Sequence, residues 1–241
     1  MVAPCLSGED MIRKILSIIL VLGAIVLFAI PQYAKYRLKE KIKEASEIVE
    51  QVPAQTLKRN EEKVIKKENF NFENVQEISP TSTFLSAGNI DKSLLLGQIV
   101  IPSVNMNLPI FKGTTNDNLL AGATTMKESD KMGQGNFTLA GHYNKDKSIL
   151  FGSLMDVKVG DIIRVTDKVN IYEYKVYDTV TIDDKALYMI DDERALIHGN
   201  NIISLMTCYY SSNTGKRYFV LGDFVKKSPY EKHLMQESQS K

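Results

Sequence analysis

The sequence predicts an all-β domain that follows an apolar N-terminal helix and a charged connecting segment. About seven or eight short runs rich in β-branched and aromatic residues, separated by turn residues, fill the second half of the chain. One long apolar run lies near the N-terminus, and a stretch rich in Lys, Glu and Asn separates it from the first short run. Closed barrels and sandwiches both consist of many short strands, so this pattern leaves the two architectures open.

The composition is that of an ordinary globular chain and argues against several functional classes. Hydrophobic residues make up 44% of the 241 residues, and the formal net charge is +1. A near-neutral chain gives no reason to expect a nucleic-acid partner. The sequence has no glycine-rich phosphate loop and no Cys/His spacing typical of zinc sites. We therefore expect no nucleic-acid partner, no metal and no cofactor.

A membrane anchor is predicted near the N-terminus, after a polar extension at residues 1–10. Residues 15–30 are apolar except for Ser17 and Gly23. A helix of that length spans about 24 Å, and flanking residues extend the span to residues 11–33, close to the ~30 Å of a bilayer core. A cleaved signal peptide is the alternative, but the run is long for one and no small-residue cleavage motif follows it. Basic residues flank the run on both sides, so charge leaves the orientation open.

A stalk is expected over residues 34–87. A helical stripe that ends at Pro53 is formed by Leu38, Ile42, Ala45, Val49 and Val52. About two heptads are too few for a coiled coil, so we expect a charged, solvated helix. Residues 55–86 have little apolar surface to bury and are expected to form a spacer that is helical in part.

The folded domain is expected over residues 88–228, with a polar tail at residues 229–241. Strands are predicted at residues 97–104, 107–111, 134–141, 161–166, 171–182, 202–208 and 218–225. Short helical turns are predicted at residues 118–123 and 149–155 and within the long connection at residues 183–200. The last two strands flank a turn at residues 211–215 and should form an antiparallel hairpin.

The predicted hairpin brings a thiol next to a permanent cation. Cys208 ends its first strand and Arg217 starts its second, so the two residues should be neighbours across the ladder. A cation beside a thiol favours the thiolate, and a guanidinium can also hold a developing oxyanion. Taken singly, a buried structural cysteine and a surface arginine are the ordinary alternatives.

Position favours His142 as the general acid or base among the three histidines of the chain. His142 follows a glycine at the end of the predicted strand at residues 134–141. His198 lies in a polar connection and His233 in the polar tail, and we interpret both as surface residues. A histidine that ends a strand is also a common turn residue, so this motif alone is weak evidence.

The two strand ends together resemble those of the sortase family. Residues 138–142 read Thr-Leu-Ala-Gly-His and residues 205–208 read Leu-Met-Thr-Cys, with Arg217 nearby. The resemblance covers about residues 97–225. It implies a closed eight-stranded β-barrel, a catalytic domain outside the cell and a cytoplasmic N-terminus.

The resemblance also implies an activity and a set of site residues. Cys208 would be the nucleophile, His142 the proton carrier, and Arg217 the group that holds the oxyanion or the substrate backbone. Ala140 and Thr207 match family positions that line the substrate groove. The implied enzyme is a transpeptidase for surface proteins with a Leu-Pro-x-Thr-Gly type sorting signal. It cleaves between Thr and Gly and joins the Thr to an amine of a peptidoglycan precursor.

Absent motifs favour the housekeeping class A over the pilin-polymerising sortases, which remain an alternative. The sequence has no Asp-Pro-aromatic lid motif and no second apolar span at its C-terminal end. Some class A members bind calcium through acidic residues that precede the histidine strand. At the matching positions this chain has two carboxylates, Glu128 and Asp130, and it has Lys127 and Gly133 where further carboxylates would be expected. Calcium prefers six or more oxygen ligands, so we expect these two to be loop charges and no calcium to be required.

Two other functional classes are kept as alternatives. An extracellular cysteine hydrolase or protease would cleave the same kind of peptide, and an added amine would not divert the product. A membrane-tethered binding module would contain a merely buried Cys208, without thiol reactivity, and would lose nothing on Cys208→Ala.

Overall fold

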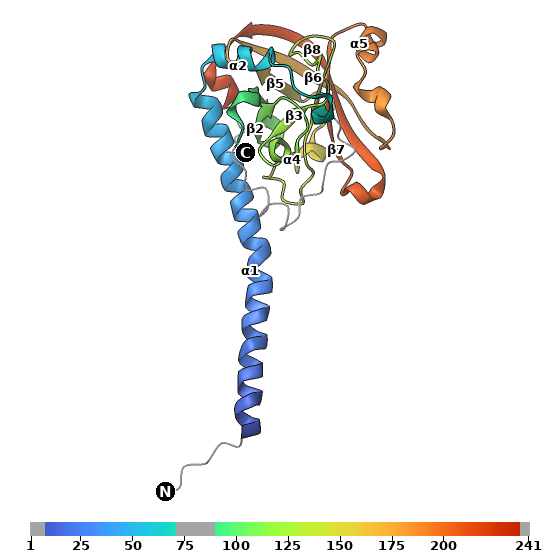
Figure 1. Cartoon of the computed structure of the whole chain (residues 1–241). Coiled ribbons are helices and arrows are strands. Elements are labelled where there is room, and N and C mark those ends of the chain that lie inside the picture. Colours follow the sequence, from blue (N-terminus) through green and yellow to red (C-terminus); the bar gives the residue numbers. More distant parts are fainter. Residues whose placement is uncertain (1–7, 71–89, 237–241) are drawn as a thin grey trace.

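The computed structural model describes residues 8–70 and 90–236 and places a long helix beneath a β-barrel (Figure 1). Helix α1, Gly8–Gln51, runs without interruption through Pro31. Helix α2, Ala54–Glu61, begins after Pro53. The predicted helix end at Pro53 is confirmed. Proline ends the helix because it lacks the N–H that would continue the α1 hydrogen-bond ladder.

Eight strands close into one barrel in the order β1-β2-β3-β4-β7-β8-β6-β5, as the family resemblance implied. The strands are β1 Leu95–Ile101, β2 Met106–Phe111, β3 Ala123–Thr125, β4 Asn136–Ala140, β5 Ile162–Thr166, β6 Asn170–Asp183, β7 Ile202–Cys208 and β8 Lys216–Pro229. Strand β1 pairs with β2 and with β5, so the sheet has no edge and the sandwich is excluded. Strand β3 was not predicted, because a strand of 3 residues is too short to show a period in the sequence.

Short helices connect the strands. They are η1 Lys67–Phe70, η3 Lys92–Leu94, η4 Pro102–Val104, α4 Asn116–Leu119, η5 Leu154–Asp156, η6 Leu187–Ile190, α5 Glu193–His198, η7 Ser212–Thr214 and η8 Lys232–Met235. The helical turns expected at residues 149–155 and 183–200 are confirmed as η5 and the pair η6 and α5. The turn expected at residues 118–123 lies earlier, as α4, and residue 123 already belongs to β3. The cap of α4 is Thr115, whose hydroxyl accepts the Asn118 N–H.

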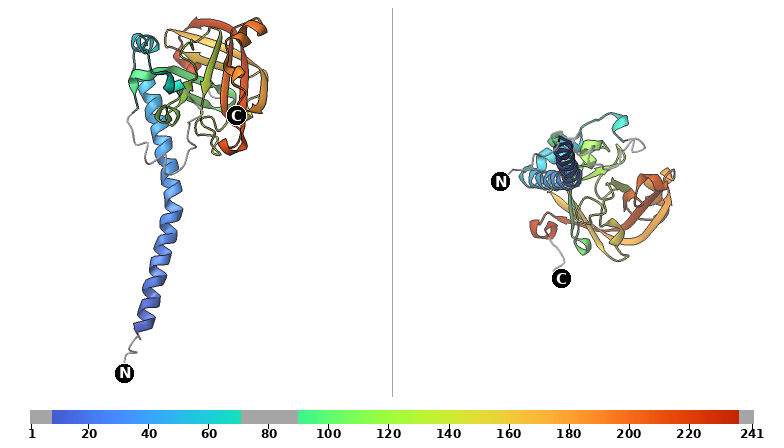
Figure 2. Two further views of the ribbon diagram at one scale, coloured as in Figure 1. Left: turned by 45° about the vertical axis from the view of Figure 1, so that its right-hand side comes forward. Right: turned by 90° about the horizontal axis from the view of Figure 1, so that it is seen from below.

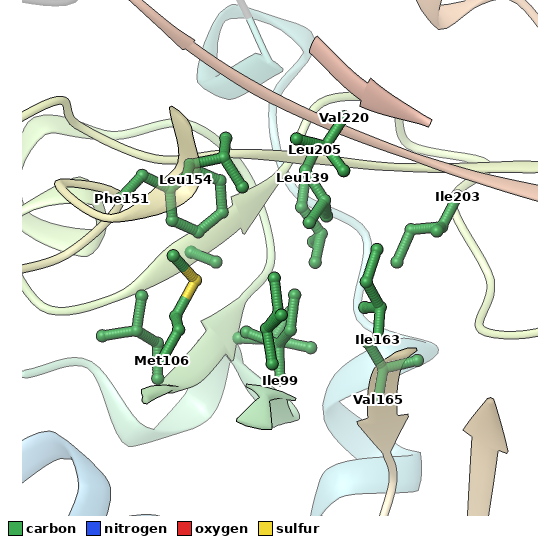
Figure 3. Close-up of a cluster of buried hydrophobic side chains, with 14 of the residues drawn as sticks. Ile99, Met106, Leu139, Phe151, Leu154, Ile163, Val165, Ile203, Leu205 and Val220 are labelled. Carbon is green, nitrogen blue, oxygen red and sulfur yellow. The ribbon is translucent and has the colours of Figure 1, made fainter. Parts of the chain in front are cut away.

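Branched and aromatic side chains fill the barrel interior (Figure 3). Ile99, Leu139 and Leu205 are each fully buried there, and burial of such a side chain contributes roughly 1.5–3 kcal/mol. Strands β4 and β7 are buried on both faces, because a second apolar cluster that includes Met189 covers their outer side. The double burial agrees with the nearly continuous apolar run of β7. Strand β4 instead alternates, and its buried polar residues Asn136 and Thr138 are hydrogen-bonded.

The second half of α1 packs on the barrel, which corrects the expectation of a solvated stalk. Leu38, Ala45, Ile48 and Val49 are buried, and Leu57 of α2 packs into the same region. The contacts are with β1 and β2, and Figure 2 shows the helix lying along one side of the barrel. The apolar stripe is therefore a docking face. The first half, with Ile18 and Leu27 among its exposed residues, is long and apolar enough to cross a membrane.

The expected polar tail also makes barrel contacts. Met235 of η8 is buried in a small cluster with Val100 and Ile171. Tyr230 and Leu234 pack against the same cluster. Three such residues in a polar stretch are too few to show a period, so the sequence did not predict this contact. The extension at residues 1–7, most of the spacer at residues 71–89 and residues 237–241 lie outside the described part of the chain.

Candidate active site

The β7–β8 hairpin places Cys208 opposite Arg217, as predicted. The connection closes through the Tyr209 N–H, which donates to the Lys216 carbonyl oxygen at 3.1 Å. The turn ends at Gly215, whose φ of +64° lies in the left-handed region that favours glycine. Cys208 is half-buried at the end of an otherwise buried strand. The thiol is therefore held at the rim of the barrel.

A parallel ladder brings His142 to the same rim. Strands β4 and β7 pair in parallel, with Ala140 opposite Met206, and the Gly141 N–H extends the ladder to the Met206 carbonyl oxygen at 3.0 Å. The buried Thr207 hydroxyl then donates to the Gly141 carbonyl oxygen at 2.8 Å. Strand β4 ends at Ala140, and the same register continued by two residues sets His142 opposite Cys208, on backbones about 4.8 Å apart.

His142 is buried in a tightly packed turn. Its side chain is 7% exposed, and its carbonyl oxygen accepts the Phe151 N–H at 3.0 Å. The preceding Gly141 lies against the Phe151 ring, and a Cβ at this position would come within 2.5 Å of that ring. The glycine of the Gly-His motif is therefore required by the packing that holds His142 in place.

Arg217 is positioned by both of its neighbouring strands. On one side it pairs with Cys208 of β7 and on the other with Ile182 of β6. Its guanidinium lies 3.9 Å from the Asp184 carboxylate and also donates to the Lys216 carbonyl oxygen at 3.3 Å. Asp184 was not among the residues expected at the site. The clue available in the sequence was that Asp184 lies just after a predicted strand, which pairs with the strand of Arg217.

The two residues expected to line the substrate groove are covered in the structure. Ala140 is 4% exposed and packs in the apolar cluster with Met189, Met206 and Phe219. Thr207 is 1% exposed, and its hydroxyl is engaged by the Gly141 carbonyl oxygen. Contact between Ala140 and a substrate would require the side chains that cover it to move, so substrate binding by this pair stays a prediction.

Three tyrosines surround the rim and were missed in the sequence. Tyr143 follows His142, and Tyr209 and Tyr210 follow Cys208. The rings of Tyr143 and Tyr210 meet edge to face with centroids 5.7 Å apart, and those of Tyr209 and Tyr210 lie 4.6 Å apart. Their position directly after the two catalytic candidates was the available signal. They form an aromatic surface beside the thiol.

Asp130 is a buried structural carboxylate, which corrects its interpretation as a loop charge. Its oxygens accept the N–H groups of Met126, Lys127 and Thr138 and the Thr138 hydroxyl. Burial raises the pKa of Asp130 to about 6, although Lys127 and Thr138 act to lower it. Within residues 8–70 and 90–236, no group of three or more His, Cys, Asp or Glu side chains could hold a metal ion. The carboxylate is occupied by protein donors and is poorly placed to bind calcium.

His198 is remote from the rim. It contacts the Asp223 carboxylate and stacks on Tyr177 with ring centroids 4.4 Å apart. Asp223 pairs with Ile202, at the opposite end of β7 from Cys208. The position agrees with the interpretation of His198 as a residue outside the site.

Comparisons with known proteins agree with the motif pattern. A family model described as a sortase domain matches residues 99–225. The chain is 41% identical to Sortase A of Listeria monocytogenes over 225 residues, which cover 93% of this chain and 96% of that protein. It is 33% identical to Sortase A of Bacillus anthracis over 218 residues, 90% of this chain and 97% of that protein.

Solved structures show the same fold. The crystal structure of Listeria monocytogenes sortase A matches with a TM-score of 0.55 and 43% identity, over 61% of this chain and 99% of that chain. Sortase C of Streptococcus pneumoniae, at 22% identity, matches with a TM-score of 0.53 over 79% of this chain and 100% of that chain. The second likeness concerns the fold alone.

Proposed function

The chain belongs to the sortase family and is a cysteine transpeptidase most like sortase A, and we propose that it attaches surface proteins to the cell wall from a single-pass membrane anchor. Its substrates in this proposal carry a Leu-Pro-x-Thr-Gly type sorting signal. The bond cleaved is the Thr–Gly peptide bond, and the acceptor is an amine of a peptidoglycan precursor.

In the first half of the reaction the Cys208 thiol passes its proton to His142, and the sulfur attacks the carbonyl carbon of the substrate threonine. A C–S bond forms, and the negative charge that develops on the carbonyl oxygen is held by N–H donors of Arg217. His142 then gives a proton to the leaving glycine amine as the C–N bond breaks. The products are a thioacyl enzyme and the released C-terminal peptide.

In the second half an incoming amine replaces the glycine. Its nitrogen attacks the thioacyl carbon, His142 takes the proton, and the C–S bond breaks to regenerate Cys208. Water can take the place of the amine, which gives hydrolysis as a side reaction. The sum of the two steps exchanges one amide bond for another, so no external energy source is needed.

One observation carries this proposal: two different strand pairings bring the three residues to one rim. The antiparallel β7–β8 pairing sets Arg217 beside Cys208. The parallel β4–β7 pairing and the Thr207–Gly141 hydrogen bond set His142 beside Cys208. A merely buried cysteine would not need a cation on one side and an imidazole on the other.

The test uses the full chain in detergent micelles. A quenched Leu-Pro-x-Thr-Gly peptide and triglycine are added, and products are followed by mass spectrometry beside the Cys208→Ala variant. We expect a peptide ligated through its threonine to triglycine, absent in the variant. Cleavage without ligation would favour the cysteine hydrolase, and transfer only to a lysine side chain would favour the pilin-polymerising alternative. No turnover and no thiol labelling of Cys208 would leave the binding module as the better account.

The proposed topology can be tested with the two natural cysteines. With the N-terminus in the cytoplasm and the barrel outside, Cys5 and Cys208 lie on opposite sides of the membrane. A membrane-impermeant thiol reagent applied to intact cells should label Cys208 and leave Cys5 unlabelled. Labelling of Cys5 in intact cells would contradict the orientation.

A further inference from the structure

Two lysines of α1 reach the loop that carries His142. The ammonium groups of Lys35 and Lys39 lie 2.7 Å and 3.1 Å from the Asp146 carboxylate. The two lysines are four residues apart and so lie on one face of the helix. Asp146 follows His142 by four positions, in the connection between β4 and η5. The helix and the catalytic loop are therefore joined by charge.

Asp146 organises the loop in which it lies. Its Oδ1 atom accepts the Ser148 N–H at 3.0 Å and the Ser148 hydroxyl at 2.7 Å, and its own N–H donates to Asn144. The loop closes where the Phe151 N–H donates to the His142 carbonyl oxygen. Lys35 and the Ser148 hydrogen bonds lower the pKa of Asp146, so the carboxylate is ionised at neutral pH. A displacement of Asp146 would be transmitted to His142 through this short, hydrogen-bonded loop.

The lysines lie on a part of α1 that the barrel holds firmly. Leu38, between them, is buried in the same cluster as Phe151 of the loop. At the far end of the helix the Lys168 ammonium donates to the carbonyl oxygens of Val49, Glu50 and Val52 at 3.0, 2.9 and 2.7 Å. These contacts satisfy carbonyl groups that a helix end leaves without partners. The helix therefore offers a fixed support for the loop.

We propose that the first turns of α1 beyond the membrane segment act as a positioning element for His142, with Lys35 and Lys39 holding Asp146. Lys35 lies only two residues beyond the expected span, which is about 3 Å along a helix. The β7–β8 turn lies at the end of the barrel that faces the first half of α1 (Figures 1 and 2). The same contacts therefore keep the catalytic rim at the membrane surface.

The test compares steady-state kinetics of the full chain in detergent micelles or lipid nanodiscs. The first variant, Lys35→Gln with Lys39→Gln, removes both ammonium groups. The second, Asp146→Asn, removes the charge and keeps an oxygen that can accept from Ser148. Lys147→Gln is the matched control. Lys147 lies in the same loop as Asp146, and its loss breaks an exposed ion pair with Asp156 of η5 but no contact with α1.

We expect kcat for transpeptidation to fall about 3- to 5-fold in the first two variants, the range that two solvent-screened ion pairs can supply. KM for the peptide should not change, because the loop positions a proton carrier and not the signal. Combining the variants should cost no more than either alone, and the control should match the parent chain. Added salt should lower the kcat of the parent toward that of the variants and leave the variants unaffected.

An unchanged kcat in the lysine variant, an effect on KM alone, or additive losses in the combined variant would overturn the inference. The inference rests on the proposed role of His142, which is tested separately by His142→Ala in the same assay. If His142→Ala retains full activity, the proposed mechanism fails. If His142→Ala is inactive and the lysine variant has the parent kcat, the positioning role alone fails.

Discussion

Thr207→Val removes the hydrogen bond that joins the segments next to Cys208 and His142. Valine has nearly the shape of threonine, so no cavity forms, but the hydroxyl that donates to the Gly141 carbonyl oxygen at 2.8 Å is lost. A buried acceptor that loses its donor costs about 1–3 kcal/mol. We therefore expect the free energy of unfolding to fall by about that amount, measured by urea denaturation.

The larger effect should be on catalysis. Gly141 directly precedes His142, and a misplacement of about 1 Å in a catalytic group can cost about 100-fold in rate. We expect kcat for transpeptidation to fall about 10- to 100-fold in Thr207→Val, with KM for the peptide little changed. The assay is the ligation of the sorting peptide to triglycine under substrate saturation.

Thr207→Ser is the matched control, because serine keeps the hydroxyl and loses only a methyl group. Its kcat should stay within about 3-fold of the parent, and its stability should fall by about 1 kcal/mol for the lost buried methyl. If Thr207→Val has the parent kcat, the hydrogen bond does not position His142. If the serine variant raises KM and the valine variant, which keeps the methyl group, does not, the methyl group contacts the substrate instead.

Three further predictions concern packing and burial. Gly141→Ala would press a Cβ against the Phe151 ring, and overpacking of this kind costs about 1–3 kcal/mol, so denaturation should show lower stability and kinetics a lower kcat. The pKa of Asp130 is raised from 3.8 to about 6, so the folded state binds this proton more tightly than the unfolded state does. The contribution of Asp130 to the free energy of unfolding therefore falls as the pH rises from about 4 to about 6. The difference in unfolding free energy between the parent and Asp130→Asn should shift by about 2–3 kcal/mol over that window, and a pH-independent difference would contradict the assignment. Leu38→Ala should lower the thermal midpoint, since a buried leucine contributes about 2–5 kcal/mol, whereas the exposed Leu27→Ala should not.

Local patterns in the chain were sufficient for the hairpin and its chemistry. The strand, turn and strand around Cys208 and Arg217 follow each other directly, so the turn length alone sets which residues face each other. The apolar run of α1 and the helix end at Pro53 were equally readable, because each depends on neighbours in sequence. The predicted eight-stranded barrel came from the resemblance of two strand ends, since strand count alone left a sandwich open.

Contacts between distant segments could not be obtained from local patterns. The parallel β4–β7 pairing that brings His142 to Cys208 joins residues far apart in sequence, and no period within either strand specifies its partner. The burial of Asp130 depends on four donors supplied by the folded loop and β4. An acidic residue in a polar stretch has the same sequence signature whether it is solvated or enclosed.

The docking of α1 illustrates the same limit most clearly. Its stripe of Leu38, Ala45 and Val49 is visible in the sequence, but such a stripe fits a solvated helix or a helix docked on a barrel surface equally well. The choice depends on whether a complementary apolar face exists elsewhere, and here β1 and β2 provide it. Because burial is a property of two surfaces and a sequence pattern describes one, the contacts of Lys35 and Lys39 with Asp146 became visible only once the chain had folded.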